Sequence, residues 1–322
     1  MRGRVALVFA ALLIVIGVPL LLAPWFGWGV PRGGEVTLTV PKGATLTDVS
    51  RQLEETGLVD APRQFRLLAR FLGSERPVQA GTYTLRKGDP WRRYLETLQK
   101  GRVTRVSVTI PEGTPSVLVA ERLMAETRLT GSIAPPPEGS VLPSTYDITP
   151  GEPRAKVVAR MQAAMQQTLD DLWPKRSPRT VVKTPEEAII LASIVEKETG
   201  KASERRMVAG VYSNRLRAGM KLDADPTVIY PITKGKPLGR RIRRSELNAD
   251  TGYNTYLKPG LPAGPIANPG ADSIAAVLDP AETDALFFVA DGSGGHVFAA
   301  TLVEHNANVA KWYALRRKRG EM

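Results

Sequence analysis

An uncharged apolar segment near the N-terminus constrains this chain more than any other feature of its sequence. It runs from Val5 to Pro31, after Arg2 and Arg4, and it contains three aromatic residues near its end: Trp25, Phe26 and Trp28. About 20 apolar residues suffice to cross the bilayer core, and basic residues favour the cytoplasmic side. We therefore expect residues 1–32 to hold the cytoplasmic N-terminus and one transmembrane helix in the cytoplasmic (inner) membrane, with the rest of the chain outside.

A cleaved signal peptide is the alternative interpretation of this segment. The uncharged stretch is longer than the apolar core of a signal peptide, and no small-residue cleavage site is evident after it. A single-pass anchor therefore fits the sequence better.

The net charge and the scarcity of cysteine and histidine limit the classes of function that fit this chain. Lys and Arg outnumber Asp and Glu by 44 to 32, giving a net charge of +12, which favours an acidic partner. Outside the cytoplasm, anionic lipid or an anionic wall polymer suits this charge better than nucleic acid, for which no motif stands out. Cysteine is absent, so disulfides and thiolate nucleophiles are excluded. With only His296 and His305 as histidines, we expect no catalytic metal.

The hydrophobic periodicity predicts an α+β fold. Strands are expected over residues 36–40, 79–85 and 105–110, and helices over 45–56, 63–72, 90–100 and 117–127. A Pro-rich break at 134–139 follows. The later part predicts helices over 154–171, 185–199, 204–218, 274–278 and 302–315, with a β-hairpin over 286–298. We expect small α+β modules over 33–145 and a mixed α+β domain over 146–322.

The helix predicted over 185–199 carries two carboxylates among apolar residues. Thr184 and Pro185 form its start signal. At about 100° per residue, Glu196 and Glu198 fall on opposite flanks of the helix, and neither points cleanly at water. Burial raises the pKa of a carboxyl group, which suits a general acid, but a structural ion pair is equally compatible with this pattern. Periodicity does not choose between the two glutamates.

A long segment over 219–270 is rich in Gly, Pro, Asn, Asp and Tyr, and we expect it to be mostly loop. Two polar clusters lie in it, Asp223–Tyr230 and Tyr253–Tyr256. Carboxylates, amides, hydroxyls and flat aromatic rings together suit a sugar ligand. The alternative is that these residues cap turns and fill the edges of the core.

Two further sequence patterns do not support serine hydrolase chemistry or phosphate binding. Ser193 is not set in a nucleophile elbow and has no histidine near it in sequence. Gly292–Gly295 is better explained as a hairpin turn than as a phosphate-binding loop.

Several motifs together resemble those of the endolytic murein transglycosylase, or YceG-like, family. They are LASIVEKET (191–199), NRLRAGMKLDADPTVIY (214–230), YNTY (253–256), GLPAGPIANPG (260–270), FFVADGSGGHVF (287–298) and EHN (304–306). Pro231 follows Tyr230 where the family pattern leads us to expect Gly. The resemblance implies a membrane-anchored protein, a LysM-like N-terminal region, and an outer domain that cleaves nascent peptidoglycan glycan strands without a cofactor.

The resemblance also implies a set of site residues. Glu196, the first glutamate of EKET, is expected to be the catalytic acid. The polar clusters of the segment 219–270, together with their place inside these motifs, lead us to expect that six residues bind the glycan near Glu196: Asp225, Thr227, Tyr230, Tyr253, Asn254 and Tyr256. Lys197, Glu198 and Asn214 are expected to support them. The expected product is a 1,6-anhydromuramoyl end, formed by attack of the substrate's own 6-hydroxyl.

Two alternatives remain for the activity. A muramidase would use water in place of the 6-hydroxyl, and a membrane-anchored scaffold would bind the wall without cleaving it. In each case peptidoglycan is the expected partner, and peptidoglycan synthases in the membrane are expected neighbours.

Overall fold

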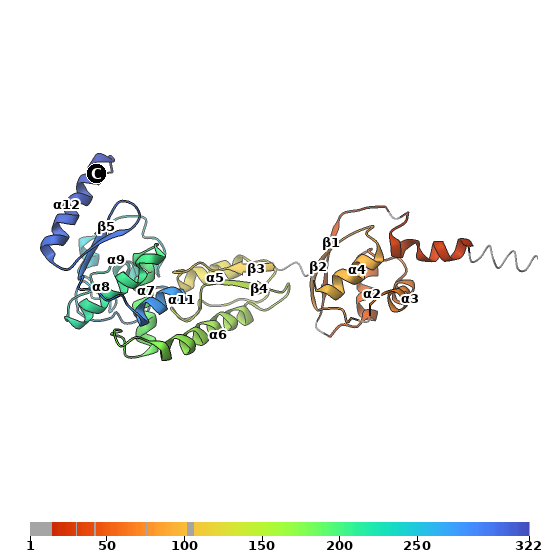
Figure 1. Ribbon diagram of the computed structural model, residues 1–322, viewed down its shortest axis with the longest axis horizontal. Coiled ribbons are helices and arrows are strands. Elements are labelled where there is room, and N and C mark those ends of the chain that lie inside the picture. The colour runs from red at the N-terminus through yellow and green to blue at the C-terminus, as the bar shows by residue number, and fades with distance from the viewer. Residues whose placement is uncertain (1–14, 30, 42, 75, 102–105, 322) are drawn as a thin grey trace, which may run out of the picture. The chain divides into compact units, whose positions relative to one another are not determined.

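Two separate apolar cores organise the chain, and its contacts divide it into two units (Figure 1). The computed structural model describes residues 15–29, 31–41, 43–74, 76–101 and 106–321. The first unit extends to Val106 and includes Asp147–Pro150, and the second unit comprises Ser107–Tyr146 and the chain from Gly151 onward. The α+β class expected from the sequence is confirmed by this mixture of helices and small two-stranded sheets.

The first unit has the element order strand, helix, helix, strand, helix. These elements are β1 (Glu35–Val40), α2 (Leu46–Glu55), α3 (Pro62–Leu72), β2 (Gly81–Arg86) and α4 (Trp91–Lys100). The strands β1 and β2 pair antiparallel, with Leu38 opposite Tyr83. Their inward side chains, with those of the helices, form the core. A LysM-like identity of this unit stays a prediction.

Residues 15–26 form a helix that is joined to the first unit. Residues 1–14 of the expected transmembrane helix lie outside the described residues. Within the described part of the chain, no helix is long and apolar enough to cross a membrane. Trp25, expected at a membrane interface, is only 4% exposed and packs in the core of the first unit, whereas Phe26 and Trp28 are exposed.

The second unit begins with elements that the sequence groups with the N-terminal region. They are α5 (Ser116–Ala125), most of β3 (Val106–Thr109) and the first two residues of β4 (Thr145–Ile148), and β3 pairs with β4. Asn268 ties this stretch to the rest of the second unit. Its amide donates to the Thr114 carbonyl over 2.9 Å and to the Ser116 hydroxyl over 3.0 Å.

Helices dominate the rest of the second unit. They are α6 (Arg154–Leu172), α7 (Pro185–Glu198), α8 (Arg205–Arg217), α9 (Asp225–Thr233), α10 (Arg244–Leu247), α11 (Ala271–Leu278) and α12 (Leu302–Lys318), with short 3₁₀ turns at Trp173–Lys175 and Ala202–Glu204. Strands β5 (Phe287–Ala290) and β6 (His296–Ala299) form the predicted hairpin. In Figure 1, α7 lies among α8, α9 and α11, and it contacts each of them.

Helix α7 is the centre of the second core. Thr184 caps it by accepting a hydrogen bond from the Glu187 amide, as its start signal predicts. Its apolar residues from Ala188 to Val195 are buried, apart from the partly buried Ile190. Burying one large aliphatic side chain contributes about 1.5–3 kcal/mol, so this packing fixes the orientation of the carboxylates that follow.

Three elements lie where the sequence predicts no helix or strand. Helices α9 and α10 fall inside the loop-rich segment 219–270. Helix α9 has Pro226 in its first turn, where proline is tolerated, and Pro231 near its end. Strand β4 lies at 145–148, for which no strand is predicted. All three elements are short, and β4 gains its partner β3 only when residues distant in sequence pair.

Arg154 joins the start of α6 to the end of α5. Its guanidinium donates to the carbonyls of Leu123, Met124, Glu126 and Gly131, and the residue is buried. These contacts satisfy carbonyl groups that the end of α5 leaves without helical partners.

We predict that Arg154→Met destabilises the second unit by about 2–4 kcal/mol, because it removes several hydrogen bonds between a buried guanidinium and backbone carbonyls. Urea unfolding followed by tryptophan fluorescence measures this loss. Lys156→Met, on the exposed side of the same helix, is the matched control and should change stability by less than about 0.5 kcal/mol. Equal effects of the two substitutions would contradict the role given to Arg154.

Candidate active site

Glu196 is tied to protein groups at the start of α11. Its Oε2 accepts a hydrogen bond from the Gly270 amide over 2.9 Å. Its Oε1 lies 3.6 Å from the Arg205 guanidinium, and the side chain is only 6% exposed. Glu196 therefore has the contacts of a buried structural ion pair, the alternative that the helix pattern leaves open.

Arg205 brings three carboxylates together. Besides Glu196, it pairs with Glu112 at 2.6 Å and with Asp272 at 3.1 Å. Lys197, expected to support catalysis, lies nearby and places its Nζ 3.5 Å from the Gly113 carbonyl. This cluster joins α7, α8, α11 and the turn before α5.

Glu198 lies on the opposite flank of α7 and lines a cavity of about 390 Å³. The same cavity is lined by six other polar residues: Tyr212, Arg215, Asp223, Asp225, Tyr256 and His305. Burial raises the pKa of the Glu198 carboxyl to about 7, and Asp225 adds to the increase, whereas a hydrogen bond with Tyr212 and the charge of Arg215 lower it. Glu198 is thus a carboxyl group that holds its proton near neutral pH.

Asp225 and Tyr256, two of the residues expected to bind the glycan, meet at this cavity. The Tyr256 hydroxyl donates to Asp225 Oδ1 over 2.6 Å. Burial and the neighbouring Asp225 raise the pKa of Tyr256, so the phenol keeps its proton. The pair offers a carboxylate and a hydroxyl beside Glu198, with the aromatic rings of Phe287 and Phe288 on the cavity wall.

Arg215 is a cavity residue that the sequence analysis missed. It is nearly buried, and it donates to the Leu286 carbonyl over 2.7 Å and to the Leu222 carbonyl over 2.9 Å. It also pairs with Asp223 at 3.2 Å. Arg215 follows Tyr212 by three residues on α8, so both side chains lie on one side of that helix. This spacing is the sequence signal that could have identified Arg215 as a neighbour of Glu198.

The two histidines differ in their surroundings. His296 Nδ1 lies 2.8 Å from Glu204 Oε2, a contact that joins β6 to the 3₁₀ turn before α8. His305 lines the cavity of Glu198 and stacks on Phe287. Burial and Arg215 lower the pKa of His305, which favours a neutral imidazole there. Among the described residues, no group of three or more His, Asp and Glu side chains is arranged to hold a metal ion.

Three other predicted site residues make internal contacts. Thr227 is fully buried, and its hydroxyl donates to the Ala224 carbonyl over 2.6 Å. Asn254 donates to the carbonyls of Leu247 and Ala249 over 2.9 and 3.0 Å. Asn214 donates to the Thr283 carbonyl over 2.7 Å. The contacts of Thr227 and Asn254 fix the start of α9, which carries Asp225, and the loop that carries Tyr256, whereas Asn214 fixes the segment at Thr283.

Tyr230 and Tyr253 lie together, away from the residues that line the Glu198 cavity. Their ring centroids are 5.0 Å apart, and Tyr230 hydrogen-bonds Glu138, whose pKa burial raises. Glu138 lines a second cavity of about 530 Å³ beside Gly264 and Pro265. The predicted glycan-binding residues therefore divide between two places in the second unit.

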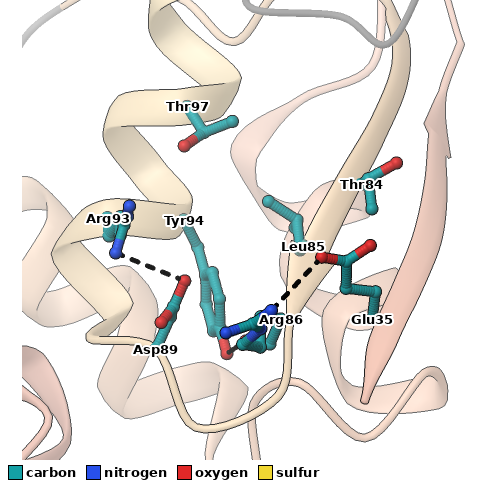
Figure 2. Close-up of a pocket in the computed structure, with 8 residues that line it drawn as sticks. All are labelled: Glu35, Thr84, Leu85, Arg86, Asp89, Arg93, Tyr94 and Thr97. Carbon is teal, nitrogen blue, oxygen red and sulfur yellow. Dashed lines mark hydrogen bonds and ion pairs between the residues drawn. The ribbon is translucent and has the colours of Figure 1, made fainter. Parts of the chain in front are cut away.

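A third cavity, of about 390 Å³, lies in the first unit (Figure 2). Figure 2 shows its two acidic side chains paired with arginines: Glu35 lies 3.5 Å from Arg86, and Asp89 lies 3.7 Å from Arg93. None of its lining residues is a buried acid. This cavity lacks a desolvated carboxyl group such as Glu198 and Glu138 provide in the other two cavities.

Comparison with known proteins places these residues in a family. The model of the YceG-like family matches residues 38–311, which is most of the chain. The chain belongs to the YceG-like family. The matched region begins in β1, ends in α12, and includes Glu196, Glu198 and all the residues that line the cavity of Glu198.

Relatives and a solved structure agree with this membership. The chain is similar to the endolytic murein transglycosylase of Bacillus subtilis, with 27% identity over 88% of this chain and 86% of the relative. It is 30% identical to that of Streptococcus pneumoniae over 86% of this chain, but spans only 58% of that relative. A crystal structure of a YceG-like protein from Listeria monocytogenes matches with a TM-score of 0.53 and 26% identity, over 85% of this chain and 98% of the other.

The raised pKa of Glu198 predicts a pH-dependent contribution to folding stability. Between its ordinary value of 4.5 and about 7, the folded protein keeps a proton that the unfolded chain has lost. Stability from this group therefore falls as pH rises through that window, by about 1–3 kcal/mol. Glu198→Gln, which cannot ionise, should be more stable relative to wild type at pH 8 than at pH 4.

Urea unfolding of both proteins at the two pH values measures this difference. Glu196→Gln is the control, because it weakens the contacts with Gly270 and Arg205 and should destabilise the protein. A stability difference between Glu198→Gln and wild type that is the same at pH 4 and pH 8 would contradict the assignment.

Proposed function

We propose that this protein is a lytic transglycosylase that cleaves peptidoglycan glycan strands at the bond from N-acetylmuramic acid to N-acetylglucosamine. The observation that carries the proposal is a carboxyl group with a pKa near 7, Glu198, in a cavity that also holds Asp225, Tyr256 and aromatic rings. Membership of the YceG-like family and the names of the relatives from B. subtilis and S. pneumoniae support it.

We propose Glu198 as the catalytic acid, in place of Glu196, which the family resemblance indicates. A general acid needs a proton near neutral pH and access to the substrate. Glu198 lines a cavity and its pKa is raised to about 7. Both oxygens of Glu196, in contrast, face protein donors, Gly270 and Arg205. The assignment to Glu196 stays a prediction that the activity of the two variants decides.

One carboxyl group is enough for the proposed reaction. Protonated Glu198 donates its proton to the bridging oxygen as the bond to C1 of N-acetylmuramic acid breaks. The N-acetyl carbonyl of the same sugar stabilises the positive charge at C1. The 6-hydroxyl oxygen then bonds to C1, and the Glu198 carboxylate takes its proton, so that no water is consumed. Because the attack is intramolecular, the nucleophile needs no separate binding site.

The neighbours of Glu198 have distinct roles in this proposal. Asp225 raises the pKa of Glu198 and fixes the Tyr256 hydroxyl, which can hydrogen-bond the sugar. Arg215 opposes the increase in pKa and stabilises the carboxylate after proton donation. Ordinary glycosidases place a second carboxyl group about 5–10 Å away as nucleophile or base, and here the substrate supplies the nucleophile.

We also propose that the chain is anchored in the cytoplasmic membrane by its apolar N-terminal segment, with the second unit outside, beside peptidoglycan synthases. The support is the uncharged run from Val5 to Pro31 behind Arg2 and Arg4. There the enzyme would cut nascent strands and limit their length.

We predict that digestion of purified glycan strands yields 1,6-anhydromuramoyl ends. Mass spectrometry distinguishes them from the products of hydrolysis, because an anhydro end is lighter by one water. Reducing muramoyl ends would identify a water-using muramidase. Strands that bind the protein and stay intact would identify a scaffold.

We predict that Glu198→Gln lowers the cleavage rate by about 10²–10⁴, because the amide has no acidic proton to donate. Glu196→Gln keeps the same size and should lower activity only as far as it lowers the folded fraction. The rates are measured on the same strands, with circular dichroism and melting temperature as the folding check. An active Glu198→Gln beside an inactive, folded Glu196→Gln would assign the acid to Glu196.

A further inference from the structure

Helix α3 has apolar residues on both of its faces. Its inner face buries Phe65, Leu68 and Ala69 in the core of the first unit. Its outer face exposes Leu67 and Phe71, four residues apart, and Phe71 is 75% exposed. Side chains four residues apart lie on the same side of a helix, so these two form a stripe that the fold of the first unit leaves uncovered.

Basic side chains flank this stripe. Arg63 precedes Leu67 by four residues, and Arg70 follows it by three, so both lie on the same exposed face. None of the ion pairs found among the described residues uses Arg63 or Arg70. A helix with exposed aromatic and aliphatic residues and arginines beside them has the composition of a segment that lies in a membrane interface.

The position of α3 next to the helix over 15–26 gives the second observation. Gln64 Nε2 donates to the Leu21 carbonyl over 2.6 Å, so the start of α3 lies beside that helix (Figure 1). Trp25 fixes the same helix in the core of the first unit. Near the other end of α3, Leu72 lines a cavity of about 380 Å³ with Phe26 and Arg92.

The contact at Leu21 sets the depth of α3 if the N-terminal segment is the membrane anchor. A span of about 20 residues that starts at Val5 ends near Pro24. Leu21 then lies within the last turn of the span, about 5 Å from its end at a rise of about 1.5 Å per residue. The start of α3 would therefore lie near the boundary between the acyl chains and the lipid headgroups.

We propose that the outer face of α3 lies in the surface of an anionic phospholipid bilayer. Leu67, Phe71 and Leu72 enter the boundary between headgroups and acyl chains, and Arg63 and Arg70 contact the lipid phosphates. This inference rests on the proposed membrane anchor. Its consequence is that the first unit is held against the membrane at a fixed height and is not free to swing on the anchor helix.

Site-directed spin labelling of the full chain tests this placement, because the chain has no native cysteine. The labelled variants are Phe71→Cys and Leu67→Cys, with Thr39→Cys on the exposed side of β1 as the matched control. Each is reconstituted into vesicles of phosphatidylglycerol and phosphatidylethanolamine and recovered by flotation. The collision rate of each label with oxygen, which concentrates in lipid, is compared with that of a water-soluble nickel chelate.

At positions 67 and 71 collisions with oxygen should exceed those with the nickel chelate, and at position 39 the order should be reversed. Floating protein with all three labels in water would overturn the placement of α3 and leave the anchor intact. Protein that does not float would overturn both the placement of α3 and the membrane anchor. Cleavage of glycan strands is measured separately and does not depend on this outcome. Labels at 67 and 71 shielded from both reagents would show that a protein covers this face, and would also overturn the proposal.

A second comparison tests the role of the arginines. In vesicles of phosphatidylcholine alone, which carry no net charge, the preference of the label at 71 for oxygen should weaken. Adding Arg63→Gln and Arg70→Gln should remove this difference between the two lipids. A preference that is the same in both lipids before the arginines are replaced would overturn the contact with anionic headgroups.

Discussion

The burial of α7 is the constraint on which the candidate site depends. Its apolar residues pack in the second core against α8 and α11, so the helix cannot rotate to bring either glutamate into water. Side chains two residues apart on an α-helix point in directions that differ by about 200° around its axis. The same packing therefore directs Glu196 toward the start of α11 and Glu198 toward α8. One becomes the partner of Gly270 and Arg205, and the other becomes a desolvated acid. A single hydrophobic interaction produces both environments.

The surroundings of Glu198 are balanced so that the carboxyl group can gain and lose its proton. Burial and Asp225 favour the neutral form, whereas Tyr212 and Arg215 favour the carboxylate. Arg215 is itself held by the carbonyls of Leu222 and Leu286, so its charge stays in place while the charge of Glu198 changes. A preorganised charge of this kind stabilises a developing carboxylate without rearrangement of the protein.

Local sequence patterns predicted most of the helices and strands, but not all of them. The helices α2 to α8 and the hairpin β5–β6 carry long periodic stretches or strong caps, and their positions agree with the prediction to within a few residues. Helix α9 is short, and its prolines at 226 and 231 hide its periodicity. The boundary near residue 106 was not predictable because the contacts of Asn268 with Thr114 and Ser116 span more than 150 positions.

The sequence by itself determined the composition of the site: two acids at the end of one buried helix, a later segment with Asp225 and Tyr256, and the motifs of the YceG-like family. Only the tertiary structure decided which of these residues meet. Asp225 and Tyr256 converge with Glu198, whereas Tyr230 hydrogen-bonds Glu138 and packs against Tyr253. Thr227 and Asn254 hold the backbone that carries Asp225 and Tyr256. The physical reason is that the pKa and contacts of a buried carboxyl group depend on neighbours contributed by other helices, which helical periodicity does not specify.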